Sequence, residues 1–311
     1  MNKHYSILHI SDLHKGENND FDHLFASLCN DADSYDQDIP KPEFIVVCGD
    51  LAEGANGEDA EEKIVKQYQE VESFLDKLVR HFLNGDKSRI IIVPGNHDLY
   101  RGATIRSMEA IPDDIRESAK ERYLKGDPQY RWSWKDFCFY LINKEEEYAS
   151  RFKFFVEFYN RFYEGIRTID DCDMLNKVID FPEYNIAFAT FNSCYRIDHL
   201  NQIGAINSKA IVESQSKLSK VFKYGRFIVG VWHHNISGIP TQTNYLDPRV
   251  LHSLMDFHIQ LGLYGHQHHT EALYEYHDIF KQGRMTLISS GCLYGRGKTM
   301  PEGTHCQYNI L

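Results

Sequence analysis

The feature that most constrains this chain is a series of short apolar runs separated by longer polar or amphipathic stretches. In chain order the runs are "YSILHI", "FIVVC", "IIIVP", "NIAFATF", "FIVGVW" and "IQLGLYG", followed by "ALYEY", "MTLISS" and "QYNIL". Short runs rich in valine, isoleucine and aromatic residues predict strands, and their alternation with longer segments is typical of α/β proteins. We therefore predict an α/β fold.

Two longer segments carry helical patterns. Residues 60–83 place apolar side chains at helical spacing, namely Ile64, Tyr68, Val71, Phe74, Leu75 and Leu78. From about residue 100 to 180 no run predicts a strand, and residues 130–165 are dense in aromatic side chains at helical intervals. We predict an amphipathic helix over 60–83 and a helical insert or cap over about 100–180. The aromatic stripe of the insert is expected to be packing core, with a base-stacking surface as the alternative.

The length of 311 residues suits one large α/β domain or two small ones, and no repeat or flexible linker divides the sequence. We expect a single domain over residues 1–311 that includes the insert. The last strand-like run, "QYNIL", stops at the C-terminus itself, so the chain also fits the N-terminal part of a longer protein.

Composition argues against several classes of protein. The chain has 34 Lys and Arg against 45 Asp and Glu, which gives a net charge of −11. This charge disfavours the binding of duplex DNA by overall electrostatic attraction, although a local basic groove or bound cations would still allow DNA to bind. Seven scattered cysteines without a C-x-x-C pair indicate reduced thiols. No apolar stretch approaches the roughly 18 residues of a membrane span, and the apolar start leaves no room for a signal peptide. We expect a soluble, cytoplasmic protein without a membrane partner.

Polar residues of only three types, Asp, Asn and His, follow five of the apolar runs. They are Asp12 and His14, then Asp50, then Asn96, His97 and Asp98, then His233 and His234, and finally His266 and His268. Ligands of open α/β sheets gather at the carboxyl ends of the strands, so these side chains are expected to converge. Gly49, Gly95 and Gly265 stand just before three of the groups and permit sharp turns there.

Spacing separates ligands from bystanders within the histidine-rich segment. His266 and His268 are two residues apart, as are Asp12 and His14, and in an extended chain that spacing puts both members on one side. His269 falls out of this phase. We therefore predict that His266 and His268 are ligands and that His269 is not.

Seven of these residues are candidate metal ligands, namely Asp12, His14, Asp50, Asn96, His233, His266 and His268. Seven exceed the four ligands of a tetrahedral zinc ion, and they suit two divalent ions about 3.5–4 Å apart that share a carboxylate and a water. Mixed nitrogen and oxygen ligands without a thiolate favour manganese, with iron, zinc, nickel or magnesium as alternatives. Cys48, although next to Gly49, is in phase with the strand interior and is not expected to coordinate.

Five motifs in fixed order carry a family resemblance. The segments "SDLH", "GDLAE", "GNHD", "WHHN" and "GHQH", over residues 12–268, resemble the signature of the calcineurin-like metallophosphoesterases. The resemblance implies an α/β sandwich in which two mixed β-sheets pack face to face between helices. One departure is Asn235, which stands where many members have proline after the paired histidines; it puts only the shape of that loop in doubt.

The resemblance also implies a role for each site residue. Asp12, His14 and His268 would bind one metal; Asn96, His233 and His266 would bind the other; and Asp50 would bridge the two. His97 resembles the family's histidine that is not a ligand but contacts the phosphate and assists the leaving group. Asp98 would orient the His97 imidazole.

The chemistry implied by this constellation is the hydrolysis of a phosphate ester. Two cations lower the pKa of a bridging water, the resulting hydroxide attacks phosphorus in line, and a protonated His97 serves as general acid. We expect a phosphodiesterase acting on a small diester or a nucleotide. A metal-dependent DNA or RNA nuclease is the alternative, because "ILHISDLHKG" also resembles the start of the DNA-repair exonuclease branch. A non-catalytic binding module would be expected to lack ligands, and none is missing here.

Two further signals are weaker. "CLYGRGKT", residues 292–299, ends like a phosphate-binding P-loop but has Cys292 where the first glycine belongs, so we predict a glycine-rich turn near the metal edge. Asn192, at the end of "IAFATF", is expected either to line the site or to form a turn.

Overall fold

The computed structural model describes residues 4–16, 20–35, 39–237, 244–278, 283–294 and 305–311. Its strands are β1 (Ser6–Ile10), β2 (Pro42–Cys48), β3 (Ile90–Val93), β4 (Met108–Ala110), β5 (Tyr130–Ser133), β6 (Cys138–Ile142), β7 (Val178–Phe181), β8 (Ile186–Thr190), β9 (Phe227–Val231), β10 (Leu261–Tyr264), β11 (Glu271–Asp278), β12 (Gly283–Ser289) and β13 (Asn309–Ile310). Its α-helices are α1 (Phe21–Ala32), α2 (Ala60–Leu83), α3 (Arg101–Arg106), α4 (Arg116–Leu124), α5 (Glu145–Ala149), α6 (Lys153–Tyr163), α7 (Ser208–Lys223) and α8 (Pro248–Asp256).

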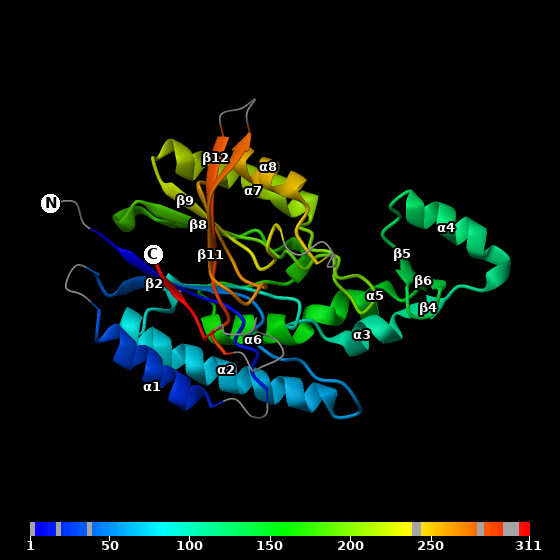
Figure 1. The fold of residues 1–311 in the computed structure, drawn as a ribbon, viewed down its shortest axis with the longest axis horizontal. Coiled ribbons are helices and arrows are strands. Elements are labelled where there is room, and N and C mark those ends of the chain that lie inside the picture. Colours follow the sequence, from blue (N-terminus) through cyan, green and yellow to red (C-terminus); the bar gives the residue numbers. More distant parts are fainter. Residues whose placement is uncertain (1–3, 17–19, 36–38, 238–243, 279–282, 295–304) are drawn as a thin grey trace.

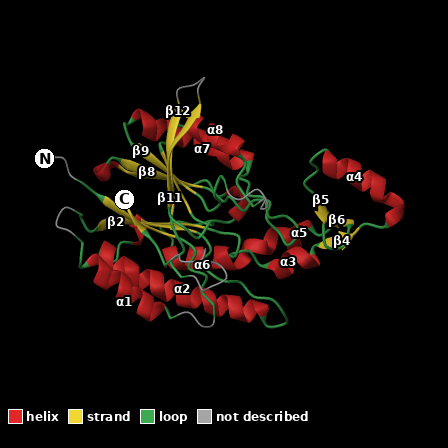
Figure 2. Ribbon diagram, viewed as in Figure 1, coloured by secondary structure: helices red, strands yellow, loops and turns green. Residues whose placement is uncertain are grey.

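Two mixed sheets form the body of the molecule. The first has the order β13-β1-β2-β3, with β1, β2 and β3 parallel and β13 antiparallel at one edge. The second has the order β11-β12-β10-β9-β8-β7, with a parallel centre of β12, β10, β9 and β8 between two antiparallel edge strands. Helices α1, α2 and α6 cover the first sheet, and α7 and α8 cover the second (Figures 1 and 2). This is the predicted sandwich of mixed sheets between helices.

Aromatic side chains fill the space between the two sheets. Phe44 of the first sheet contacts Phe181 and Phe188 of the second, with ring centroids 4.8 and 5.1 Å apart. Valines and leucines from the centres of both sheets belong to the same buried cluster. Burial of apolar surface stabilises the folded state by about 25 cal/mol for each Å² removed from water. The contacts between the two sheets therefore hold them face to face.

The strand and helix predictions outside the insert are confirmed. All nine apolar runs contain strands, β1 to β3 and β8 to β13, and α2 covers residues 60–83 as predicted. The apolar stripe of α2 is buried, with Tyr68 and Val71 2% and 0% exposed, and it packs against the first sheet and α6.

The insert differs from the prediction of an entirely helical segment. It contains helices α3 to α6, but also a three-stranded antiparallel sheet of order β4-β6-β5, which projects from the body together with α4 (Figure 1). The prediction that no strand lies in this region is therefore wrong. Tyr130, Trp132 and Trp134 are each two residues apart, and this alternation is the period of a strand. The helical spacing of the aromatic residues in α6 does not extend back to this segment.

The aromatic stripe itself has the predicted packing role where it is helical. On α6 the aromatic residues Phe154, Phe155, Phe158, Tyr159, Phe162 and Tyr163 are buried. Tyr68 of α2 stacks on Phe158 with ring centroids 5.1 Å apart. The C-terminal half of the insert is thus part of the core of the body.

The described residues include all the cysteines and the helices α1 to α8. All seven cysteines lie among the described residues, and each is a free thiol. Within the described ranges, no helix combines the length and the apolar character that a membrane crossing would need.

A buried histidine in β1 links folding to pH. His9 lies between the Sγ of Cys48, 3.3 Å from its Nε2, and the side-chain amide of Asn309, 3.3 Å from its Nδ1. Burial lowers the pKa of His9 to about 3, from 6.5 for an unburied imidazole. The unfolded chain therefore binds this proton more readily than the folded one, and the stability that His9 contributes is lost as pH falls below 6.5.

We expect wild type to lose about 2 kcal/mol more unfolding free energy than His9→Gln between pH 7 and pH 5. Only in wild type does the unfolded chain bind a proton at residue 9 that the folded chain does not bind, which costs about 1.4 kcal/mol of stability per pH unit below 6.5. Urea unfolding at both pH values measures the difference. The same pH slope in both proteins would contradict the prediction.

Candidate metal centre

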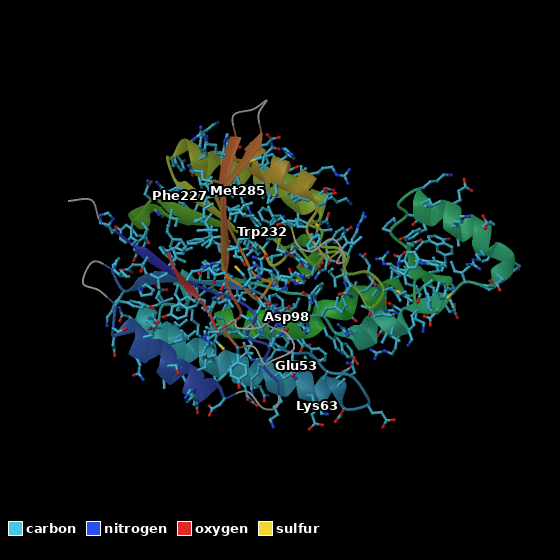
Figure 3. The ribbon with its side chains drawn as sticks, viewed as in Figure 1. Glu53, Lys63, Asp98, Phe227, Trp232 and Met285 are labelled. Atoms are coloured by element: carbon cyan, nitrogen blue, oxygen red, sulfur yellow. The ribbon has the colours of Figure 1, made fainter. Side chains whose placement is uncertain are left out.

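The site forms where loops from both sheets meet at the carboxyl ends of five strands. The loops after β1 and β2 are joined by backbone hydrogen bonds from Asp12 N to Gly49 O and from His14 N to Asp50 O, of 3.1 and 3.0 Å. The loops after β9 and β10 are joined from Gly265 N to His233 O, at 2.9 Å. In Figure 3, Asp98 and Glu53 mark the side of the first sheet, and Trp232, directly before His233, marks the second.

Glycines let these loops approach each other closely. A Cβ atom added at Gly95 would overlap the carboxylate and backbone of Asp50, and one added at Gly265 would overlap the side chain of Ser11. Both positions therefore need glycine for close packing, as the motifs predicted.

The ligand-bearing loops have an unusual backbone. Five of the seven expected ligands have positive φ, namely Asp12 (55°), His14 (41°), Asp50 (52°), His266 (73°) and His268 (57°). A residue other than glycine pays about 1–3 kcal/mol for such a conformation and keeps it only where the surrounding structure imposes it. The packing of both sheets thus holds these side chains in place.

The first group of candidate ligands, called the first group of ligands below, consists of Asp12, His14 and His268. The Nε2 atoms of the two histidines lie 3.1 Å apart. The Oδ1 atom of Asp12 faces them, at 3.6 Å from His14 and 3.3 Å from His268. This buried oxygen forms no hydrogen bond of normal geometry within the described part of the chain.

The second group of candidate ligands consists of Asn96, His233 and His266. The Nε2 atom of His233 lies 3.0 Å from the Oδ1 of Asn96 and 3.2 Å from the Nδ1 of His266. The Nδ1 of His233 donates to the carbonyl oxygen of Cys48 at 2.6 Å, which directs the Nε2 lone pair into the site.

Asp50 lies between the two groups. Its Oδ2 atom is 3.9 Å from the Nε2 of His14 and 3.4 Å from the Nε2 of His233. Its other oxygen, Oδ1, accepts a hydrogen bond of 2.7 Å from the backbone N–H of His97. One carboxylate oxygen is therefore held by the protein, and the other faces both groups.

The charges of the site balance one another. Burial opposes ionisation of Asp50 and Asp12, but the neighbouring histidines outweigh it and hold the pKa of each carboxyl well below its usual range. Burial would lower the pKa of His233, yet the Asp50 carboxylate raises it to about 9. Burial and the charge of His233 lower the pKa of His266 to about 3. Protonated imidazoles thus offset the carboxylates here, a task that divalent cations perform equally well.

The donor set fits two divalent ions. Two pairs of imidazole nitrogens face each other within 3.2 Å, each pair has a carboxylate oxygen beside it, and Asp12 Oδ1 lacks a hydrogen bond among the described residues. Within the described ranges, the triads Asp50–His233–His266 and His14–Asp50–His97 bring their candidate ligand atoms within 4.8 Å of one another. A third triad joins His14 and His268 to Cys292, which the sequence had not suggested as a ligand.

His97 lies at the edge of the site. Its Nδ1 donates to the carbonyl oxygen of Glu53 at 3.1 Å, so its Nε2 is the atom left for a substrate. Its ring stands edge-on to His14, with centroids 4.7 Å apart. The imidazole is thus oriented by a backbone carbonyl of the "GDLAE" loop.

Asp98 does not orient the His97 imidazole as expected. Its carboxylate accepts hydrogen bonds from the backbone N–H groups of Leu51, Ala52 and Gly95, at 3.1, 3.2 and 2.8 Å, and from the hydroxyl of Tyr68 at 2.9 Å. Burial and the nearby Asp50 raise the pKa of Asp98 to about 6. Asp98 therefore connects the two loops that carry Asp50 and Asn96, and the sequence could not show this because most of its partners are backbone groups.

The sequence also missed one polar neighbour of the site and left two questions open. The side-chain nitrogen of Asn244 lies 2.7 Å from the Nε2 of His266, a contact without any local sequence signal. Asn192 proves to form a turn, since its Oδ1 accepts from Cys194 N at 2.7 Å and its Nδ2 donates to Cys172 O at 3.1 Å. The glycine-rich turn predicted over 292–299 lies, from residue 295 on, outside the described residues.

Comparison with known proteins assigns the chain to a family. Residues 5–270 match the calcineurin-like phosphoesterase family, and the chain belongs to that family. This is the family that the five motifs predicted. Members of this family generally bind a dinuclear metal site, which the residues gathered here fit.

Individual relatives are distant. A DNA polymerase II small subunit from Methanocaldococcus jannaschii is 29% identical over 133 residues, which cover 38% of this chain and only 21% of that protein. Purple acid phosphatase PPD1 from yellow lupin shares the fold at 9% identity, with a TM-score of 0.50 over 98% of this chain and 47% of that one. A dimetal phosphatase from Danio rerio has a TM-score of 0.47 at 14% identity, over 98% of this chain and 91% of that one. This chain thus spans about a fifth to a half of the length of the polymerase subunit and the lupin enzyme.

Asp98→Asn is expected to destabilise the protein by about 3 kcal/mol and Tyr68→Phe by about 1 kcal/mol. Asparagine presents an NH₂ group to backbone N–H donors and leaves buried donors without an acceptor, whereas phenylalanine removes one bond of several. Urea unfolding at pH 7 measures both. A fully stable Asp98→Asn variant whose turnover falls as it does for His97→Ala would instead support the role first expected at His97.

Proposed function

We propose that this chain is a dinuclear metal-dependent phosphohydrolase that cleaves phosphodiesters. The observation that carries the proposal is the position of Asp50 Oδ2, which lies 3.9 Å from His14 Nε2 in one group of ligands and 3.4 Å from His233 Nε2 in the other. A carboxylate oxygen so placed suits a bridge between two ions.

Each ion would have its own ligands. Asp12, His14 and His268 would hold the first ion, and Asn96, His233 and His266 the second, with Asp50 shared. When bound, two such ions activate a water molecule and bind the phosphate oxygens, and manganese is the first metal that these nitrogen and oxygen ligands suggest.

The protein's own contribution to the chemistry centres on His97. Its Nδ1–H is held by the carbonyl oxygen of Glu53, which favours a ring whose Nε2 faces the substrate. A proton on Nε2 would pass to the departing oxygen and neutralise the charge that develops there. The hydrogen bond from His97 N to Asp50 Oδ1 couples the position of this residue to that of the bridging carboxylate.

A diester substrate is supported by the sequence match to a protein named as a subunit of a DNA polymerase, since DNA is a phosphodiester polymer. A small diester or a nucleotide fits the acidic net charge of −11 better than a long polyanion does. We therefore place a small phosphodiester or nucleotide first.

A nuclease that acts on single strands is the second candidate, and one observation favours it. Trp134 and Phe137 in the projecting part of the insert are 77% and 65% exposed, and Trp134 packs edge-on against Trp132. Exposed aromatic rings of this kind stack on nucleobases, whatever the sequence of the strand.

The central test is metal content together with hydrolysis of bis-p-nitrophenyl phosphate. We expect wild type to bind two Mn²⁺ ions per chain and to hydrolyse the diester, and treatment with a chelator to abolish activity reversibly. Asp50→Asn is expected to lose at least one ion and about 100-fold or more in kcat, which corresponds to about 2.7 kcal/mol of barrier. Elemental analysis and steady-state kinetics measure both quantities.

The matched control for Asp50→Asn is Asp113→Asn, which removes a carboxylate whose side chain is 93% exposed on the insert. It is expected to keep both ions and full turnover. A wild-type protein that binds no metal and shows no Mn²⁺-dependent hydrolysis of a phosphate ester would refute the proposed function.

His97→Ala is expected to lower kcat by about 100-fold and to leave two ions bound, because the residue donates a proton and ligates neither metal in the proposed arrangement. Turnover and metal content are measured on the same preparation. Loss of both ions in this variant would contradict the assigned role.

The choice between small diester and single strand is tested with end-labelled single- and double-stranded DNA. If single strands are the substrate, Trp134→Ala with Phe137→Ala should weaken their binding by about 1–3 kcal/mol for each stacked base. Tyr224→Ala, at an exposed ring of the C-cap of α7, is the control. DNA left intact in a buffer that supports hydrolysis of the small diester would exclude the nuclease.

A further inference from the structure

The segment after β12 leads into the first group of ligands. Ser290 N donates to Tyr264 O at 2.8 Å, and Leu293 N donates to Ser11 O at 3.1 Å. These bonds fix the segment against the end of β10 and the loop after β1. Cys292 lies between them with none of its surface exposed.

The thiol of Cys292 faces the ligands of that group. Its Sγ donates to the carbonyl oxygen of Asp12 at 3.2 Å. Sγ and one ring nitrogen each of His14 and His268 lie within 4.8 Å of one another. The thiol thus lies close enough to the two histidines for all three to hold one ion.

A second observation points independently to an ion at this place. Asp12 Oδ1, whose residue is 0% exposed, is directed at His14 and His268 and forms no hydrogen bond of normal geometry within the described part of the chain. A buried carboxylate oxygen in that state is costly unless a cation compensates it. One oxygen, two nitrogens and one sulfur therefore converge beside Asp50, and carboxylate, imidazole and thiolate are all donors that zinc takes.

The second group of ligands is different. Cys48, the nearest thiol in sequence to Asp50, has its Sγ 3.3 Å from the Nε2 of His9, and no candidate triad among the described residues includes it. Among the described residues, the triad Asp50–His233–His266 contains no sulfur. The two halves of the centre therefore differ in the softness of their donors.

We propose that Cys292 is a thiolate ligand of the ion held by Asp12, His14 and His268, and that it makes this position selective for a thiophilic ion such as Zn²⁺. The proposal rests on the proposed dinuclear function and adds an eighth ligand to the seven of the motifs. On binding, the thiol releases its proton to solvent and exchanges its hydrogen bond with Asp12 O for a bond to the ion. Without sulfur, the other position keeps the preference of nitrogen and oxygen ligands for harder ions.

The alternative is that Cys292 is a small apolar residue that only fills space, which is common for buried cysteines. Spectroscopy with Co²⁺ separates the two, because a thiolate bound to Co²⁺ gives an intense near-ultraviolet charge-transfer band that nitrogen and oxygen ligands do not give. This readout requires no substrate and no turnover.

The experiment adds Co²⁺ to the metal-free wild-type chain and follows the absorption spectrum and the number of ions bound. We expect two ions per chain and one charge-transfer band that saturates with one of them. Cys292→Ser should lose the band and weaken Zn²⁺ binding at one position by at least about tenfold. Loss of a residue that only hydrogen-bonds to a ligand already weakens metal affinity by about 10- to 100-fold. The matched control Cys48→Ser, which alters an equally buried thiol, should keep the band.

Three outcomes would overturn the proposal, and they are distinguishable from one another. Two bound ions without a charge-transfer band would remove Cys292 from the ligands and leave the proposed function intact. A band that Cys48→Ser abolishes and Cys292→Ser retains would assign the sulfur to the other thiol. Failure of wild type to bind any ion would refute the dinuclear function together with its eighth ligand. Because the wild-type spectrum decides the first and third cases, neither depends on a variant that folds.

Discussion

The rest of the structure depends on the compensation of two buried carboxylates. Asp12 and Asp50 are 0% and 1% exposed, and each lies within 4 Å of imidazole nitrogens. Isolated charges at that depth would be strongly destabilising, so the protein must surround them with positive charge from protons or from metal ions. The convergence of four histidines from three loops is the structural answer to that requirement. The same convergence makes the place suitable for binding divalent cations.

To keep the histidines and carboxylates of the site in these positions, the loops and sheets around them must also be rigid. Their loops have left-handed backbone at five positions, which a flexible chain would relax. The carboxylate of Asp98 connects the loops after β2 and β3, and the aromatic layer around Phe44 fixes the first sheet on the second. Stability and function are therefore coupled here, because the contacts that keep the sheets together also keep the two groups of ligands at a constant separation.

The insert and the segment after β12 contribute what the shared motifs do not. The insert supplies the aromatic face of α6 to the core and presents Trp134 and Phe137 to solvent from a small separate sheet. The segment after β12 brings Cys292 to the first group of ligands. Both lie outside the five motifs, so they are where this chain would acquire its own substrate and metal preferences within the family fold.

The sequence by itself determined the nine strands of the apolar runs, the helix over 60–83 and the convergence of the seven candidate ligands, because each is encoded locally. The spacing of apolar residues along a helix or strand indicates which of its side chains are buried. A polar residue directly after a strand lies at the edge of the sheet because the chain connects it to that strand. The partners of Asp98, the carbonyl that orients His97 and the contact of Asn244 with His266 were decided only by tertiary structure. Most of these contacts join residues that lie far apart in the sequence. The contacts of Asp98 and His97 also use backbone atoms, which every residue has and which therefore leave no sequence signal. For the same reason Cys292, more than 20 residues after His268 in the chain, became a candidate ligand only once the second sheet had folded beside β1.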